Sequence, residues 1–127
     1  MITHERETKY TRAVRACLQR AGHATNAELA AQVRHAFPRV SDTTIHRVTQ
    51  RFYDRGQVRT APNAPDGAVR YDNNNLFHDH FMCQGCHSLK DVTISAAMRV
   101  QLEQAVEGCC LNGSLVIVGD CKKCKEK

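Results

Sequence analysis

The sequence has no long apolar run and no signal peptide, and its amino terminus, MITHERETK, is polar. A membrane-spanning helix needs about 20 apolar residues, so we expect no membrane segment. The seven cysteines are an odd number, which argues against the fully paired disulfide framework of a small secreted domain. These absences predict a cytoplasmic protein in a reducing compartment.

Acidic residues are scarce in the first part of the chain, and lysine is almost missing from it. Residues 1–71 contain twelve Lys and Arg, eleven of them Arg, against six Asp and Glu, a net charge of +6. Residues 72–127 contain six against seven, a net charge of −1. Arginine suits bidentate contacts with bases and phosphates, so this asymmetry favours double-stranded DNA as the partner over a merely solvated basic surface.

The chain shows no internal repeat or low-complexity tract, and its 127 residues suffice for one ordinary domain or two small ones. Two units of about 60 residues would each be marginally stable without a metal, a disulfide or a partner. We therefore expect zinc and a second subunit to contribute to stability.

Helical periodicity and capping signals predict three helices in the first part, over residues 5–21, 25–37 and 42–55. Two short strands follow at 57–60 and 68–71, around a turn rich in proline and glycine. Three helices followed by a basic hairpin form a winged helix-turn-helix, so we assign residues 1–71 to a DNA-binding domain. The polar residues 72–75 are the expected hinge.

The remaining residues, 76–127, alternate strand and helix patterns in a small α/β domain. We expect strands at 76–82, 88–93 and 115–118 and a helix at 95–107. The last strand has four consecutive apolar residues, which predicts burial on both faces and thus pairing with a second copy of the chain. The fold class is therefore α+β, with a winged helix followed by a dimerisation domain.

Two CxxC pairs predict a structural zinc site. Cys83 and Cys86 form the first pair, and Cys121 and Cys124 form the second, with 34 residues between the pairs. Four thiolates suit tetrahedral zinc, whereas a thioredoxin-like redox site would use one pair and leave the other idle.

A second metal site is indicated by His78 and His80, which lie two residues apart on a predicted strand. Residues i and i+2 of a strand face the same side, so both imidazoles can reach one ion, although such a pair can also be coincidental. Asp91 falls opposite this end of the strand if the first cysteine pair closes a hairpin. Asp79 faces the other way, where a hydrogen-bonding role or a solvated charge is favoured over ligation.

The third helix turns Ile45, Val48 and Phe52 inward and leaves polar side chains for the major groove. The candidate DNA-binding residues are Thr43, Thr44, Arg47, Gln50 and Arg51 on this helix, with Arg59 and Arg70 on the wing for phosphate contacts.

With the wing, the HDHFMCQGC run and the terminal CKKC in place, the chain resembles the ferric uptake regulator family of metal-dependent bacterial repressors, from about Tyr10 to Cys124. The stretch SDTTIHRVTQRFYDRGQV is similar to the family's recognition helix and turn. The resemblance implies a homodimer that binds operator DNA. It also implies a regulatory metal site, carried over to His23, Asp72, His78, His80 and Asp91.

In this family resemblance, His23 belongs to the DNA-binding domain and the other ligands to the hinge and dimer domain. A bound ion would therefore fix the orientation of one domain relative to the other. Three imidazoles and two carboxylates suit Fe(II) or Mn(II). Peroxide-sensing members of the family typically have Asp where iron-sensing members have Glu, and zinc-sensing members often use a hinge cysteine that is missing here. We therefore favour a peroxide-responsive repressor, with an iron- or manganese-responsive uptake repressor as the alternative.

The chain departs from the family pattern at several positions. It lacks the additional amino-terminal helix that members usually have, and His46 replaces the usual tyrosine of the recognition helix. Phe77, Asn112 and Gly113 stand where ligands of a third metal site would be expected, so we predict no third site. A zinc-stapled adaptor that binds protein instead of DNA is the alternative from another class. We do not expect an enzyme, because no separate general base or substrate motif accompanies the metal ligands.

Overall fold

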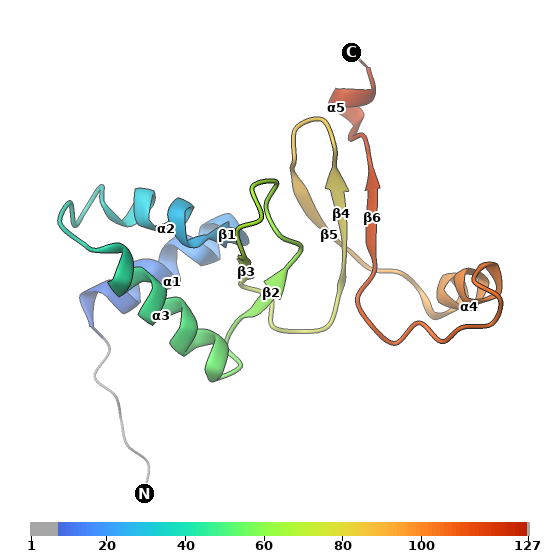
Figure 1. Cartoon of the computed structure of the whole chain (residues 1–127), viewed down its shortest axis with the longest axis horizontal. Helices are drawn as coiled ribbons and strands as arrows, with labels where there is room; N and C mark the ends of the chain where they lie inside the picture. The colour runs from blue at the N-terminus through green and yellow to red at the C-terminus, as the bar shows by residue number, and fades with distance from the viewer. Residues whose placement is uncertain (1–7, 127) are drawn as a thin grey trace, which may run out of the picture. The chain divides into compact units, whose positions relative to one another are not determined.

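The structure is a computed structural model that describes residues 8–126 (Figure 1). The chain divides into two compact units, the first ending at Asn75 and the second beginning at Leu76. Each unit has its own three-stranded sheet. No helix within the described residues is long and apolar enough to span a membrane.

Three helices form the first unit's core. They are α1 (Lys9–Ala21), α2 (Asn26–Val33) and α3 (Asp42–Asp54). The predicted start of the first helix at residue 5 lies outside the described residues. Helix α1 ends at Gly22, whose φ of 79° is in the left-handed region that glycine tolerates best.

Helix α2 begins with the predicted capping box, in which Thr25 and Glu28 each accept a hydrogen bond from the other's backbone N–H. It ends at Val33, earlier than predicted. The residues that follow form tighter turns, in which, for example, the His35 N–H donates to the Gln32 carbonyl three residues earlier. Phe37 instead packs edge-on against Tyr10 of α1, with ring centroids 5.4 Å apart.

The small sheet of the first unit has the strand order β1-β3-β2 and is antiparallel throughout. Its strands are β1 (His23–Thr25), β2 (Arg59–Ala61) and β3 (Arg70–Asp72). The sequence predicted the second and third as a wing, but not β1, which joins α1 to α2. Asp72, assigned to the hinge from sequence, is the last residue of β3.

The buried apolar cluster lies entirely in this first unit. It contains Val14, Cys17, Leu18, Ala24, Leu29, Ala30, Val33, Val40, Ile45, Val48, Phe52, Val58 and Tyr71. Cys17 is therefore a core residue, as its place in the helical pattern predicted.

In the second unit, β4 (Asp79–Cys83) is the central strand. It pairs antiparallel with β5 (Leu89–Val92) and parallel with β6 (Val116–Gly119). Helix α4 (Ala96–Ala105) connects β5 to β6, and the short α5 (Lys122–Lys125) follows β6. Parallel strands end at the same edge of a sheet, so the ends of β4 and β6 lie together.

The second unit buries little apolar surface. Val116, Ile117 and Val118 of β6 are about half exposed, at 44%, 47% and 48%, and α4 buries none of its residues. The burial predicted for both faces of β6 is therefore not reached within a single chain. The dependence of this unit on a metal and a partner stays a prediction.

Candidate metal centres and DNA-binding face

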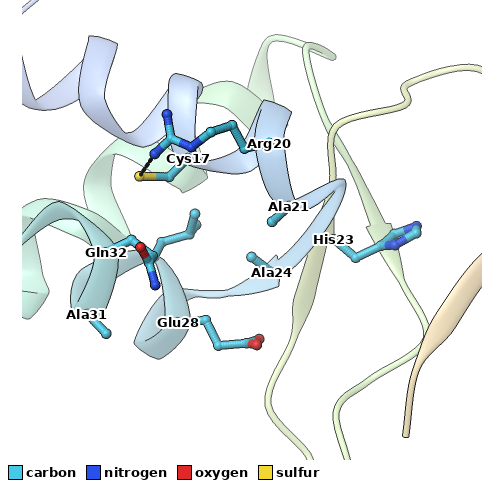
Figure 2. A pocket seen from close by; sticks show the side chains of 9 residues that line it. Cys17, Arg20, Ala21, His23, Ala24, Glu28, Ala31 and Gln32 are labelled. Carbon is cyan, nitrogen blue, oxygen red and sulfur yellow. Dashed lines mark hydrogen bonds between the residues drawn. The ribbon is translucent and has the colours of Figure 1, made fainter.

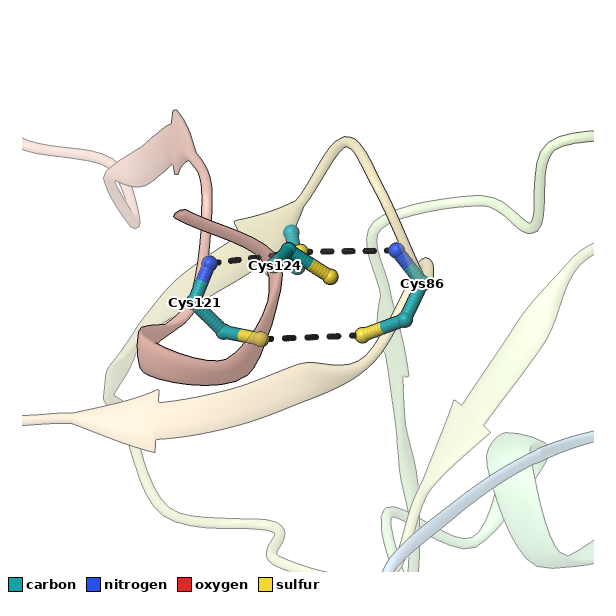
Figure 3. A group of neighbouring side chains, drawn as sticks. Cys86, Cys121 and Cys124 are labelled. Atoms are coloured by element: carbon teal, nitrogen blue, oxygen red, sulfur yellow. Dashed lines mark hydrogen bonds between the residues drawn. The ribbon is translucent and has the colours of Figure 1, made fainter. Parts of the chain in front are cut away.

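Four cysteines converge where β4 and β6 end. Cys83 is the last residue of β4, and Cys86 lies in the turn after it. Cys121 immediately precedes α5, and Cys124 lies within α5. Their four sulfur atoms lie within 4.8 Å of one another. The Cys86 and Cys121 sulfurs are 3.9 Å apart (Figure 3). A tetrahedron with Zn–S bonds of about 2.3 Å has sulfurs about 3.8 Å apart, so this four-cysteine cluster matches a structural zinc site.

Backbone N–H groups stabilise a negatively charged thiolate in this cluster. The N–H groups of Cys121 and Cys86 donate to the Cys83 sulfur over 3.3 and 3.5 Å. These donors, Cys121 first, lower the pKa of Cys83 to about 6. Hydrogen bonding among the thiols, led by Cys83, raises the pKa of Cys124 to about 12. A divalent ion bound here would favour deprotonation of all four thiols.

Gly85, inside the first cysteine pair, leaves the space that the cluster needs. A Cβ at this position would lie 2.8 Å from the sulfur of Cys124 and 3.0 Å from its Cβ. Only glycine lets the two cysteine pairs approach this closely. The glycine within the CQGC motif indicates this close approach, although the sequence-based prediction did not use it.

Three of the predicted regulatory ligands meet within the second unit. Asp91 of β5 is paired with His80 of β4 in the strand register. One carboxylate oxygen of Asp91 lies 3.2 Å from Nε2 of His78 and 3.5 Å from Nε2 of His80. The two imidazole rings are 4.5 Å apart between centroids. Two imidazoles and a carboxylate thus converge through their Nε2 and oxygen atoms, a donor set that suits a divalent metal.

The orientation of the His78 ring is set by the backbone. Its Nδ1 lies 2.7 Å from the carbonyl oxygen of Leu76, which can only accept a hydrogen bond. Nδ1 therefore carries the proton, and Nε2 keeps its lone pair on the side of Asp91 and His80.

Asp79, between the two histidines, points to the other side of β4, as expected. It is buried and accepts hydrogen bonds from Arg99 of α4 over 2.6 Å and from the Leu115 N–H over 2.8 Å. Burial raises the pKa of Asp79, but the Leu115 N–H and the Arg99 guanidinium outweigh burial and lower it overall. Asp79 is thus a buried hydrogen-bonding group that ties α4 and the start of β6 to β4.

The other two predicted regulatory ligands face each other within the first unit. His23 of β1 and Asp72 of β3 are partners in the antiparallel register, with Nε2 of His23 and a carboxylate oxygen of Asp72 3.4 Å apart. The other Asp72 oxygen accepts a hydrogen bond from the Asn74 N–H over 2.9 Å. The sequence did not predict this pairing, because it placed His23 in a turn and gave no indication of β1.

The exposed side of α3 carries most of the predicted DNA-binding side chains. Thr43, Arg47 and Gln50 are exposed there, whereas Arg51 is half-buried. The Thr44 hydroxyl lies 3.0 Å from the capping Ser41 hydroxyl, and the Gln50 amide donates to Asp54 over 2.8 Å. Thr43 and Arg47 are therefore the most available of the five for base edges.

The two wing arginines are less exposed than Arg47 of α3, and their contacts with phosphate stay a prediction. Arg59 of β2 is half-buried and Arg70 of β3 is 9% exposed, so neither presents a fully exposed guanidinium to a DNA backbone. All three residues of β3 are buried, and in β2 only Thr60 is exposed. Arg55, exposed at the end of α3, is a basic residue that the sequence-based prediction did not include.

A cavity of about 390 Å³ opens in the first unit where α1, β1 and α2 meet (Figure 2). The Arg20 guanidinium donates to the Cys17 sulfur over 3.3 Å at one side of it. His23 lines the rim, but its ring is directed away from the other labelled side chains.

Residues 2–114 match the model of the ferric uptake regulator family. No curated protein sequence matches the chain. Among solved structures, the chain is similar to the ferric uptake regulator of Helicobacter pylori, which is described as having three functional metal binding sites. That likeness has a TM-score of 0.75 and 17% identity, over 96% of this chain and 83% of the other.

Two further structures are similar over most of their length. The peroxide stress regulator of Campylobacter jejuni has a TM-score of 0.66 and 24% identity, over 91% of this chain and 88% of the other. A zinc uptake regulator in complex with zinc and DNA has a TM-score of 0.63 and 19% identity, over 95% and 84%. At these identities the similarity concerns the fold.

Proposed function

Because the chain belongs to the ferric uptake regulator family, we propose that it is a metal-dependent, DNA-binding transcriptional repressor that responds to peroxide. The observation that carries the proposal is the convergence of His78, just before β4, with His80 of β4 and Asp91 of β5 through Nε2 and carboxylate atoms. The same strand, β4, ends in the four-cysteine cluster. One small sheet thus offers a thiolate site and a nitrogen and oxygen site, which select different metals by ligand type.

The proposed regulatory ion is held by His23 and Asp72 of the first unit together with His78, His80 and Asp91 of the second. His23 and Asp72 face each other across β1 and β3, and the other three meet where the start of β4 lies beside β5. An ion bound by both sets would favour one relative orientation of the units. The difference between the metal's affinities for that orientation and for the others is the free energy available to switch DNA binding on.

The proposed assembly is a homodimer that presents two α3 helices to operator DNA in the cytoplasm. The half-exposed apolar residues Val116, Ile117 and Val118 supply a surface suited to a second copy. Thr43 and Arg47 of α3 are the proposed base contacts, with Thr44, Gln50 and Arg51 beside them and Arg59 and Arg70 nearer the phosphates.

The peroxide response rests on aspartate at positions 72 and 91. A carboxylate on the shorter aspartate side chain is less able to bind in a bidentate manner, which would leave a coordination position open to peroxide. Bound Fe(II) would supply the redox chemistry. In the overall reaction, one oxygen atom of hydrogen peroxide enters a C–H bond of His23 or His78, and the other leaves as water. An oxidised imidazole binds metal poorly, so the repressor would leave DNA.

The test is mass spectrometry of Fe(II)-loaded and Mn(II)-loaded protein after mild peroxide treatment, combined with release of a labelled promoter fragment. The wild type should gain one oxygen on a ligand histidine and lose DNA binding in the iron form only. Asp91→Glu should reduce both effects. An iron form that keeps its histidines and its DNA, while the amount of iron alone controls binding, would instead identify an iron- or manganese-responsive uptake repressor.

The same experiment separates a DNA-binding repressor from a zinc-stapled adaptor. A repressor should shift the promoter fragment only when Fe(II) or Mn(II) is added. Zinc-loaded protein that binds no DNA with either ion, in any sequence context, would favour the adaptor.

A further inference from the structure

Three polar side chains connect the start of α2 to the middle of α3. The Thr49 hydroxyl donates to Oδ1 of Asn26 over 2.8 Å, and Nδ2 of Asn26 lies 3.2 Å from Nδ1 of His46. Thr49 is fully buried, whereas His46 is exposed on α3. The chain of hydrogen bonds therefore runs from the core to the surface.

This arrangement determines which nitrogen of His46 carries a proton. Thr49 has one hydroxyl proton, and its shortest contact is the 2.8 Å bond to Asn26, against 3.2 Å to the carbonyls of Ile45 and His46. Oδ1 of Asn26 then accepts, so the amide group facing His46 is the NH₂ donor. Nδ1 of His46 must accept from it, which leaves the proton on Nε2.

His46 lies on the same side of α3 as the proposed base contacts. Thr43 and Gln50 are three residues before and four residues after it, and all three are exposed. Gln50 already donates to Asp54. His46 differs from these neighbours because the buried Thr49, through Asn26, determines that its Nε2 presents an N–H donor to solvent.

We propose that His46 is a specificity-determining residue that donates its Nε2–H to an acceptor on a guanine edge in the major groove, with Asn26 and Thr49 as positioning residues. Guanine presents N7 and O6, two adjacent acceptors, whereas cytosine presents an amino donor there. A donor fixed on Nε2 therefore favours guanine and opposes cytosine at one position of each half-site. This inference rests on the proposed DNA-binding function.

The first experiment measures the tautomer in the free, zinc-loaded protein and does not depend on DNA. Long-range nitrogen–proton NMR distinguishes neutral imidazoles protonated on Nε2 from those protonated on Nδ1. The wild type should show His46 protonated on Nε2. Thr49→Val removes the hydroxyl with little change of shape and should produce a mixture of tautomers, whereas Thr49→Ser should retain Nε2–H.

The second experiment selects binding sites from random duplex DNA with metal-loaded protein at a fixed salt concentration. The wild type should prefer guanine at one position per half-site. There, 7-deazaguanine, which lacks N7, or 2-aminopurine, which lacks O6, should weaken binding about twofold to thirteenfold, the range for one net hydrogen bond. His46→Phe should abolish the preference at that position alone. Thr49→Val should relax it, although Thr49 is buried and cannot touch DNA, and Thr49→Ser should restore it.

The outcomes separate this inference from the proposed function. Wild-type protein that enriches no DNA sequence with any regulatory metal would refute the repressor function itself. Protein that selects DNA but holds His46 protonated on Nδ1 would overturn the inference. An unchanged base preference at every position in His46→Phe, or equal behaviour of Thr49→Val and Thr49→Ser, would also overturn it.

Discussion

Replacing Gly85 by alanine is the smallest change that should damage the four-cysteine cluster while keeping all of its thiols. The added Cβ would lie 2.8 Å from the Cys124 sulfur. Ordinary contacts between such atoms are about 3.5–4.0 Å, so one of the two groups must move by about 1 Å. The φ of Gly85 is not in the left-handed region, so the expected damage comes from this contact and not from backbone strain.

The size of the effect follows from the tolerance of zinc sites. Ligand distances at such sites are held to within about 0.2 Å, so a shift of about 1 Å cannot be absorbed while Cys124 stays in place. Overpacking of this kind costs about 1–3 kcal/mol, which corresponds to zinc affinity lower by about 5-fold to 150-fold.

The assay is competition for zinc between the protein and a chromophoric chelator, together with thermal unfolding at fixed free zinc. Gly113→Ala is the matched control, because a Cβ there meets nothing within 4 Å. It should bind zinc as the wild type does. Wild-type zinc affinity in Gly85→Ala would refute the argument that the two cysteine pairs approach too closely for a methyl group.

Four further predictions concern the thiols, the Asp79–Arg99 ion pair and DNA. Cys83→Ser should lose zinc, dimer and solubility together, as measured by metal content and sedimentation, whereas Cys109→Ser, an exposed thiol outside the cluster, should keep them. The Cys83 pKa is lowered to about 6 from 9.0, so its contribution to the stability of metal-free, reduced protein is full above about pH 9 and is lost as the pH falls through 6. Urea unfolding of the wild type should show this rise from pH 6 to 8, and a flat profile over that range would contradict the reasoning. Asp79→Ala removes the carboxylate that pairs with Arg99 and should lower the free energy of unfolding by about 1.5–3 kcal/mol in chemical denaturation, with Asp91→Ala, a partly exposed carboxylate, as the milder comparison. Arg47→Ala should relax sequence preference in binding-site selection, and Arg59→Ala should reduce the salt slope of binding by at most about one, with wild-type behaviour of both variants placing the DNA contacts elsewhere.

Features with a strong local or chemical signature could be predicted from the sequence. The capping box at Thr25 and the glycine after α1 located helix ends, because both act within a few residues. The two CxxC pairs predicted the four-cysteine cluster, because few other functions place thiols at that spacing. The period of two predicted that His78 and His80 reach one point, and both approach Asp91, although the strand begins one residue after His78.

Features that depend on distant pairing could not be predicted. Strand β1 has three residues and no usable periodicity, and it exists because it pairs with β3 nearly fifty residues later. The role of Asp79 depends on Arg99 and Leu115, which come beside it only through α4 and the parallel strand β6. The burial of Arg70 likewise depends on tertiary packing, because every residue of β3 is buried and the sequence shows no alternation that would reveal it.

The parallel pairing of β4 with β6 also affects the order of events during folding. His80 pairs with Val116 across 36 residues, whereas Met82 pairs with Leu89 within a short hairpin. Loop-closure entropy makes the hairpin the earlier event and the docking of β6 a late one. Until β6 docks, other chains can contact its three apolar side chains, Val116, Ile117 and Val118. They can also pair with the open edge of β4. We therefore expect zinc, by joining the ends of these two strands, to shorten the period in which a newly made chain can aggregate, so that a shortage of zinc would first appear as a lower yield of folded protein.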